Sequence, residues 1–256
     1  MVEGDRVRRV LHVDDDEAFL DLSATFLERT DEDLVVHSET SADAGLAYFE
    51  DNPVDCIVSD HDMPGLNGIE FLTAVRERDP DVPFILFTGK GSEEIASEAI
   101  SAGVTDYLQK DVGSDQYTVL ANRVTNAVDR SRAEQQVAAT ESQLQAIVEH
   151  TSDAILIIDA DSRIRFANPA VERLFGYTPA ELDGESLTTL MPAAFREHHL
   201  AAVERFLASG ERTVDWESIE MPGQHRDGEE LPLSISFGSF TENGERRFIG
   251  ILRKRT

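Results

Sequence analysis

The chain has 256 residues, of which 41% are hydrophobic and 7% aromatic, so it can form packed cores in one or two domains. Its formal net charge of −27 has the same sign as a nucleic-acid backbone, which argues against a nucleic-acid partner bound through its phosphates. No stretch approaches the ~20 apolar residues of a membrane span, and the N-terminus lacks a signal peptide's apolar region. We therefore expect a cytoplasmic protein with no membrane and no nucleic-acid partner.

Short apolar runs alternate with helical patterns through residue 112, which predicts a doubly wound, five-stranded parallel sheet with helices on both faces. The expected strands lie near Arg8 to Val13, Leu34 to His37, Cys56 to Ser59, Phe84 to Phe87 and Tyr107 to Gln109. Cys56, the only cysteine, lies in the third run and is expected to be a buried core thiol.

Polar residues follow four of these runs. The acids Asp14 and Asp15 follow the first, Asp60 follows the third, Thr88 the fourth and Lys110 the fifth. In an open α/β sheet the carboxyl ends of the strands border the ligand crevice, so these residues can converge on one pocket. Carboxylates suit Mg²⁺, and a metal, a hydroxyl and an ammonium around one carboxylate stabilise a phosphoryl group passing onto that carboxylate.

Four features occur in order, each after its own strand: an acid pair, the Asp-x-x-Met-Pro-Gly-x-x-Gly segment of residues 60–68, a Thr and a Lys. With them the chain resembles the receiver domain of two-component response regulators over about 130 residues. The resemblance implies that Asp60 accepts a phosphoryl group from a histidine kinase or phosphotransfer protein. It implies a Mg²⁺ site formed by Asp15, Asp60 and the carbonyl of Asp62, with Asp14 acting through water. It also implies that Thr88 and Lys110 bind the phosphoryl oxygens.

The same resemblance implies a switch in which Tyr107 repacks when Thr88 moves, with an output face over residues 92–102 and 115–128. The chain departs from the family where Asp111 follows Lys110, since receivers commonly have proline there. The cis bond that orients the lysine is then expected to be absent. Asp62 and Lys90 occupy variable positions beside the site, and their opposite charges predict a pair across its mouth.

Residues 1–112 hold 27 acidic against 8 basic residues, and lysine occurs only at positions 90, 110 and 254. Abundant acid with arginine preferred to lysine resembles the proteins of salt-accumulating haloarchaea, so we expect a halophilic protein. An ordinary acidic protein is the alternative. Self-repulsion of this charge would destabilise the compact state in dilute buffer.

Residues 114–150 contain no Gly or Pro and predict a helix that continues from the receiver into a connector. Ser131, Glu134 and Glu141 interrupt a strict heptad pattern, so a homodimer through this helix is left open. The expected domains are residues 1–130, the receiver; 131–150, the helical connector; and 151–256, a second domain.

The second domain is predicted to be an α+β module with an antiparallel sheet. Its expected elements are a hairpin at 154–159 and 164–167, helices at 170–175 and 193–208, and strands at 213–219, 230–240 and 246–252. It resembles a PAS domain over residues 141–256 through Asp159 to Asn168, Leu174 to Tyr177, Glu181 to Gly184, Arg226-Asp227-Gly228 and Gly250 to Arg253. PAS domains sense ligands, bind cofactors or pair with one another, so a homodimer through this domain is also open.

The PAS ligand is not named by the sequence. His199 stands where similar oxygen-sensing PAS domains place a haem-ligating histidine, but Ile219 replaces the arginine that contacts bound gas in those sensors. Many haem-free PAS domains carry histidine here too, so we do not expect haem. A flavin bound through a reactive thiol is excluded because Cys56 lies in the other domain.

These features predict a two-component signalling protein that is not an enzyme and that passes its state to a downstream signalling protein. One alternative is the N-terminal sensory fragment of a hybrid histidine kinase. Another is an aspartyl phosphohydrolase with Asp60 as nucleophile and Asp62 as proton donor, although the chain has no room for that class's cap domain.

Overall fold

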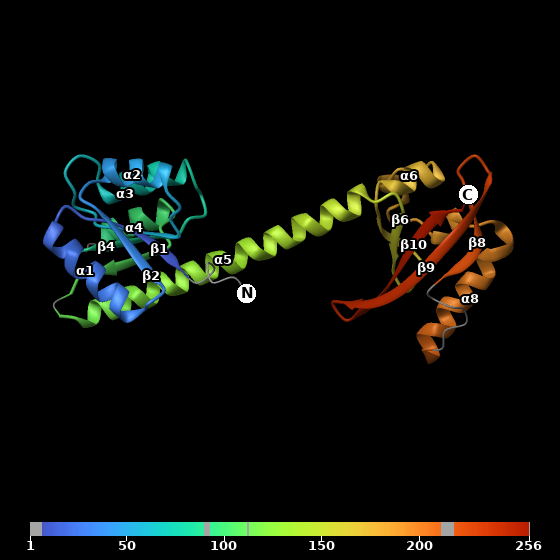
Figure 1. The fold of residues 1–256 in the computed structure, drawn as a ribbon. Helices are drawn as coiled ribbons and strands as arrows, with labels where there is room; N and C mark the ends of the chain where they lie inside the picture. The colour runs from blue at the N-terminus through green and yellow to red at the C-terminus, as the bar shows by residue number, and fades with distance from the viewer. Residues whose placement is uncertain (1–6, 90–92, 112, 211–217, 256) are drawn as a thin grey trace. The chain divides into compact units, whose positions relative to one another are not determined.

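A computed structural model of the protein describes residues 7–89, 93–111, 113–210 and 218–255. The chain divides into two compact units, residues 1–138 and 139–256, here called the N-terminal and C-terminal units (Figure 1). Each is described by itself. None of the described helices has a stretch long and apolar enough to cross a membrane.

The N-terminal unit contains a five-stranded parallel sheet in the order β2-β1-β3-β4-β5. Its strands are β1 (Arg8–Val13), β2 (Leu34–Glu39), β3 (Cys56–Ser59), β4 (Phe84–Thr88) and β5 (Asp106–Gln109). The strand order reverses direction between β1 and β3, and in such sheets ligands bind outside the carboxyl ends of the strands at that point. The predicted fold class and the five strands are confirmed, to within two residues at their ends.

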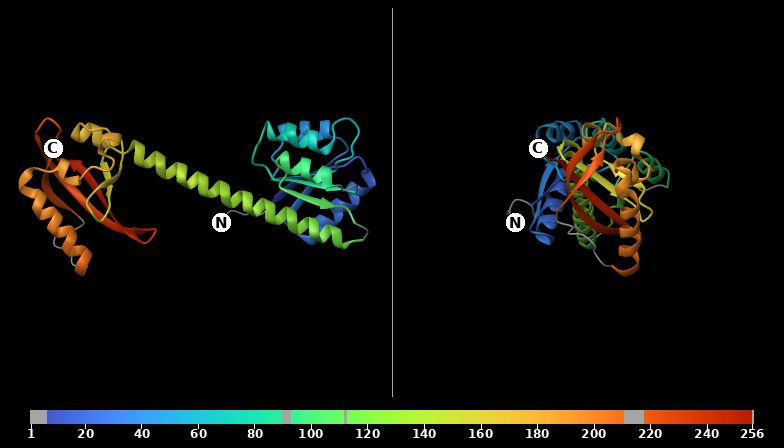
Figure 2. Two further views of the ribbon diagram at one scale, coloured as in Figure 1. Left: turned by 180° about the vertical axis from the view of Figure 1, so that it is seen from behind. Right: turned by 90° about the vertical axis from the view of Figure 1, so that its right-hand side faces the viewer.

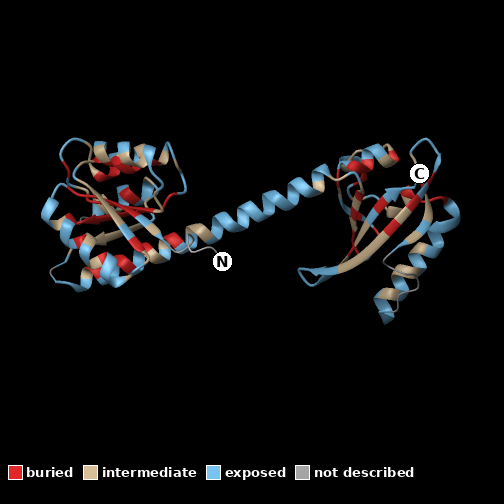
Figure 3. Ribbon diagram, viewed as in Figure 1, coloured by how far each residue is buried: buried red, intermediate tan, exposed pale blue. Residues whose placement is uncertain are grey.

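Five helices accompany the sheet: α1 (Glu17–Thr30), α2 (Ala42–Asp51), α3 (Gly68–Arg76), α4 (Glu93–Ser101) and α5 (Asp115–His150). Helices α1 and α5 share an apolar core with one face of the sheet, and α2, α3 and α4 share a core with the other (Figure 2). Burial on both faces explains why β3 and β4 are continuous apolar runs rather than alternating ones (Figure 3). Cys56 is fully buried, as predicted.

Polar caps fix where the helices near the sheet's carboxyl edge begin. The Asp16 carboxylate accepts a hydrogen bond from the Phe19 amide and so starts α1 directly after the acidic pair. Asn67 and Glu70 form a reciprocal capping box that starts α3. These caps set the positions of the loops that follow β1 and β3.

The C-terminal unit has a five-stranded antiparallel sheet in the order β7-β6-β10-β9-β8. The strands are β6 (Ala154–Ile158), β7 (Ile164–Ala167), β8 (Ile219–Gln224), β9 (Glu230–Glu242) and β10 (Glu245–Lys254). Helices α6 (Ala170–Phe175), α7 (Pro179–Leu182) and α8 (Ala193–Ser209) and the 3-10 helix η2 (Leu187–Leu190) connect β7 to β8. Residues of the strands, α6, α7 and η2 form one apolar core. The predicted antiparallel sheet is confirmed.

Residues 213–217 of the strand predicted at 213–219 lie outside those described. The structure has a strand that was not predicted, β8, which begins at Ile219 and runs through Pro222 and Gly223. Proline cannot donate a hydrogen bond to a ladder, so the segment does not look like a strand in sequence. It is tolerated here because β8 is an edge strand, paired on one side with β9.

Helix α5 is continuous from Asp115 to His150, as predicted for the connector. Beyond Val128 most of its apolar side chains are exposed, with Val137, Leu144 and Ile147 each 57% exposed in the single chain. Dimerisation through this segment stays open.

Candidate functional site

Asp60 lies at the carboxyl end of the central strand β3 and is only 5% exposed. Its Oδ2 accepts a hydrogen bond from the Asp62 amide at 2.8 Å, and its Oδ1 lies 2.9 Å from Lys110 Nζ. The backbone amide of Asp60 donates to the Val13 carbonyl, which ties the ends of β3 and β1 together. The carboxylate is therefore oriented by two groups, and its backbone is tied to β1.

Asp14 and Asp15 occupy different environments. Asp14 is buried, and its Oδ2 accepts a hydrogen bond from Lys110 Nζ at 2.5 Å. Burial raises the pKa of Asp14 above its ordinary value, while the hydrogen bond and charge of Lys110 oppose that rise. Asp15 is exposed at the start of the loop. Asp16 caps helix α1.

Lys110 joins the two buried carboxylates. It follows β5, its amide donates to the Thr88 carbonyl, and its side chain is 19% exposed. Burial by itself lowers the pKa of the ammonium, but hydrogen bonds to Asp14 and Asp60 outweigh burial and raise that pKa above its ordinary value. No cis peptide bond occurs among the described residues, so Lys110 reaches both carboxylates with a trans bond to Asp111.

Thr88 and Tyr107 lie on the strands next to Asp60. Thr88 ends β4 and is fully buried. Tyr107, on β5, pairs in register with Leu86, two residues before Thr88. Its hydroxyl has no hydrogen-bond partner among the described residues, and burial raises the pKa of Tyr107.

The predicted Mg²⁺ site consists of oxygen donors around Asp60. The residues that the structure describes contain no group of three or more His, Cys, Asp or Glu side chains placed to hold one ion. Mg²⁺ does not require one, because it is usually bound by one or two carboxylates and keeps several waters. Asp15, Asp60 and the carbonyl of Asp62 offer oxygen donors of that kind, so the residues fit the ion.

Two residues near the site were given no role by sequence reasoning. The ring of Phe19 lies under Lys110, with its centroid 4.4 Å from Nζ. Gly68, the last residue of the motif, approaches Asp60 so closely that a Cβ would lie 2.3 Å from the Asp60 carbonyl oxygen. The spacing of the motif was a signal for Gly68; nothing in the sequence singles out Phe19. Lys90 lies outside the described residues, so its pairing with Asp62 stays a prediction.

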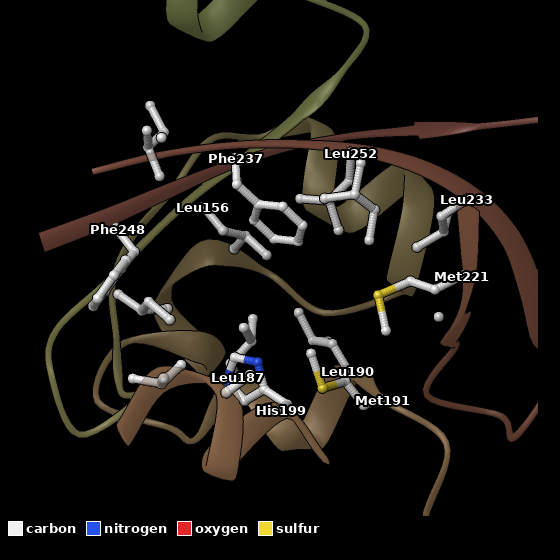
Figure 4. A pocket seen from close by; sticks show the side chains of 18 of the residues that line it. Leu156, Leu187, Leu190, Met191, His199, Met221, Leu233, Phe237, Phe248 and Leu252 are labelled. Atoms are coloured by element: carbon white, nitrogen blue, oxygen red, sulfur yellow. The ribbon is translucent and has the colours of Figure 1, made fainter. Parts of the chain in front are cut away.

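The C-terminal unit contains a partly open apolar cavity of about 140 Å³ between its sheet and the segment from η2 to α8 (Figure 4). Leu156, Met221 and Phe237 line it from the sheet, and Leu187 and Met191 line it from the helical side. Among the described lining residues, His199 has the one titratable side chain.

His199, which was not expected to bind haem, lies against this cavity. Its Nε2 lies 3.0 Å from the hydroxyl oxygen of Ser162, which is itself buried. Burial lowers the pKa of His199, so the neutral imidazole is favoured. The neighbouring His198 is exposed.

Comparison with known proteins assigns both units. Residues 10–122 match the response regulator receiver domain family, and residues 142–255 match the PAS fold family. The chain therefore contains a receiver domain followed by a PAS domain. This is an architecture of two-component signalling. Below, the N-terminal unit is called the receiver and the C-terminal unit the PAS domain.

Individual relatives are bacterial sensors and regulators. The sensor protein FixL of Bradyrhizobium diazoefficiens is 30% identical over 116 residues, which are 45% of this chain and 23% of FixL. The transcriptional regulatory protein FixJ of the same organism is 33% identical over 113 residues, which are 43% of this chain and 53% of FixJ. The chain thus spans less than two thirds of either relative.

Among solved structures, a CheY-like response regulator receiver domain protein from Methanospirillum hungatei is 29% identical, with a TM-score of 0.46. The alignment covers 50% of this chain and 98% of that protein.

Proposed function

We propose that the receiver accepts a phosphoryl group on Asp60 from the phosphohistidine of a histidine kinase or phosphotransfer protein. The observation that carries the proposal is the ion-pair bridge at the carboxyl edge of the sheet. One ammonium, Lys110, contacts the buried carboxylates of Asp14 and Asp60, and the Thr88 hydroxyl belongs to the adjoining strand. A single lysine between two carboxylates leaves net negative charge, which favours a further cation.

The reaction is a transfer between two nucleophiles. An Asp60 carboxylate oxygen forms a bond to phosphorus as the phosphorus–nitrogen bond of phosphohistidine breaks. The imidazole nitrogen keeps the electron pair, and Asp60 becomes a mixed anhydride. Mg²⁺ held by Asp15, Asp60 and the carbonyl of Asp62, with Asp14 acting through water, would supply positive charge opposite the phosphoryl oxygens.

Lys110 and Thr88 then have distinct tasks. The ammonium leaves its carboxylate partners for the arriving phosphoryl oxygens, and the Thr88 hydroxyl donates to one of them. Movement of Thr88 makes room for Tyr107 to repack. The Tyr107 hydroxyl makes no hydrogen bond to the described residues that would keep the ring in its present position. A dianion held by fixed donors stabilises one of two states, which is what a switch requires. The downstream signalling protein would recognise that state.

The test is mass spectrometry of the full chain after incubation with acetyl phosphate and Mg²⁺. We expect a gain of one phosphoryl group in the wild-type protein and none in Asp60→Asn, because the amide keeps the shape but is not a competent nucleophile. Asp62→Asn serves as the control, since it changes a neighbouring carboxylate and keeps Asp60. Wild-type labelling of Asp60→Asn would overturn the proposal.

This role makes the receiver a phosphoryl acceptor and not an enzyme with an external substrate. The phosphohydrolase alternative predicts many turnovers of phosphate release from a phosphate monoester, whereas an acceptor that takes its phosphoryl group from phosphohistidine should release no phosphate from a monoester. The kinase-fragment alternative is favoured by one fact, that the sensor histidine kinase TmoS of Ectopseudomonas mendocina is 26% identical over 192 residues, and this chain covers 19% of it. Coding sequence for a kinase domain directly after Thr256 would support that alternative.

We propose that the PAS domain is sensory and binds a small, uncharged, apolar molecule. A dry cavity of about 150 Å³ suffices for benzene, and the cavity here is about 140 Å³. A haem is much larger than benzene, and the His199 nitrogen that faces Ser162 is already engaged. The cavity as it stands therefore does not fit a haem.

Benzene is the probe for this second proposal. It should raise the unfolding midpoint of the PAS domain, followed by fluorescence of Trp216, the chain's single tryptophan. Ala202→Phe, which fills the cavity from α8, should remove the shift. No shift in the wild-type protein would contradict the proposal. A haem absorption band that is lost in His199→Ala would also overturn it.

A halophilic origin is supported by composition alone, since FixL and FixJ are proteins of a bacterium. It is proposed here on the excess of acid and the scarcity of lysine. The cytoplasmic location predicted from the sequence stays a prediction.

A further inference from the structure

Lys110 leaves β5 without the proline that follows this lysine in similar receivers. Asp111 stands there, and the backbone amide of Lys110 is tied to Thr88 while its long side chain has four rotatable bonds. Asp14 and Asp60 both contact the ammonium at the far end of this side chain. Ordering such a side chain costs conformational entropy, so further contacts are needed to keep the tip in one place.

The contact that the structure provides is the face of Phe19. The ammonium nitrogen lies 4.4 Å from the ring centroid, within the range in which a cation is attracted to the π face of an aromatic ring. The Lys110 side chain is 19% exposed, so water weakens this attraction less than it would at an open surface. Asp14, Asp60 and Phe19 thus contact one ammonium from three segments.

The ring of Phe19 is itself fixed. Its backbone amide donates to the Asp16 carboxylate, and the Asp16 amide donates to Asp14 Oδ1, which ties the start of α1 to the acidic pair. The ring packs against Phe87 on β4 at 5.8 Å and against Tyr117 on α5 at 6.0 Å between centroids. Phe87 immediately precedes Thr88. These contacts hold the Phe19 ring in one position beside Lys110.

We propose that Phe19 is a positioning residue for Lys110: its ring face holds the ammonium beside Asp60 and thereby increases the rate at which Asp60 accepts a phosphoryl group. The inference rests on the proposed phosphoryl-acceptor function. An aliphatic side chain of similar size could fill the same space but could not attract the cation. This difference separates a positioning role from simple packing.

The first test compares Phe19→Leu with Phe19→Tyr in the full chain. Initial rates of acyl phosphate formation are measured with acetyl phosphate at saturating Mg²⁺, and Mg²⁺ affinity is measured by calorimetry. We expect Phe19→Leu to slow formation about fivefold, as for loss of one partly desolvated cation–π contact. Phe19→Tyr should stay near the wild-type rate, and Mg²⁺ affinity should be unchanged in both. Equal slowing by the two variants would show a packing role and overturn the proposal.

A double-variant cycle identifies the partner. In a Lys110→Met background, Phe19→Leu should have no further effect on the rate, because the cation it positions is gone. Persistence of the fivefold effect in that background would contradict the assignment of Lys110 as the partner.

A second measurement does not depend on phosphorylation. The chain has three lysines, so proton–carbon spectra of lysine-labelled protein contain few side-chain signals, and Lys110→Met identifies that of Lys110. Because Lys110 lies over the Phe19 ring, the ε-methylene protons of Lys110 should be shifted upfield. The shift should be lost in Phe19→Leu and kept in Phe19→Tyr. If the upfield shift is absent in the wild-type protein, the positioning role of Phe19 is overturned. If the shift is present but Asp60 is not labelled by acetyl phosphate, only the proposed phosphoryl-acceptor function is rejected.

Discussion

Lys110 and Asp60 form an ion pair of 2.9 Å across the end of strand β4, although they are 50 positions apart in the chain. The pair exists because β3, β4 and β5 are parallel neighbours, so residues that follow them meet at one edge. The same ammonium reaches Asp14 after β1. One cation therefore balances part of the charge of two buried carboxylates.

Removing that cation should destabilise the receiver and increase its dependence on Mg²⁺. We expect Lys110→Met to lower the free energy of unfolding by about 2 kcal/mol without Mg²⁺, because two buried carboxylates lose their counter-charge while some solvent access remains. Mg²⁺ should restore part of the loss by binding the folded state. Urea unfolding with and without MgCl₂ measures both effects. Equal stability of the variant and the wild-type protein would contradict this account of the bridge.

Gly68 should tolerate no side chain. A Cβ there would lie 2.3 Å from the Asp60 carbonyl oxygen, which is backbone and cannot rotate away. Gly68→Ala is expected to cost about 1–3 kcal/mol of stability, as overpacking does, and to displace the Asp60 loop. Gly89→Ala is the matched control, because its Cβ would meet nothing closer than 4.0 Å. Similar unfolding midpoints for the two variants would refute the close-approach argument.

The sequence predicted the receiver well because its signals are local. Runs such as Cys56 to Ser59 are apolar throughout, as strands buried on both faces must be, and polar residues mark where each run ends. Chain order alone then predicted that Asp60, Thr88 and Lys110 gather at one edge. The Lys110 bridge to both carboxylates could not be predicted, since its reach depends on side-chain rotamers.

The PAS domain was harder because two of its features depend on tertiary context. Strand β8 contains Pro222 and Gly223, which are tolerated only because it lies at the sheet edge. His199 lies on a helix with polar neighbours, and only the folding of α8 beside the sheet turns it toward the cavity (Figure 4). Neither the edge position nor that orientation can be derived from residue spacing.

Acid should destabilise the PAS domain through His199. Burial lowers the pKa of His199 in the folded state, so below the unfolded value of about 6.5 the unfolded chain binds a proton that the folded chain does not. Stability contributed by the neutral ring is thus present above about pH 6.5 and is lost as the pH falls from there toward the lowered folded pKa. Urea unfolding followed by Trp216 fluorescence between pH 7.5 and 5 measures this loss.

The comparison that isolates this histidine uses two variants. His199→Leu should show a shallower fall in stability with pH than the wild-type protein, even if it is less stable at every pH because Ser162 loses its partner. His198→Leu, which changes the exposed neighbour, should keep the wild-type slope. If His199→Leu keeps the wild-type slope as well, another group is responsible.

Salt should stabilise the receiver more steeply than the PAS domain. Residues 1–138 hold 30 acidic against 11 basic residues, a formal charge of −19, whereas residues 139–256 hold 20 against 12, a charge of −8. The screening length falls from about 10 Å at 0.1 M salt to about 3 Å at 1 M, so salt weakens the larger self-repulsion of the receiver by more.

Hydrogen exchange of the full chain across a KCl series reports on the two units separately. Screening alone saturates near molar salt, so continued protection beyond it would indicate specific ion or hydration effects. Identical receiver protection in 0.1 M and 2 M KCl would reject the halophile prediction.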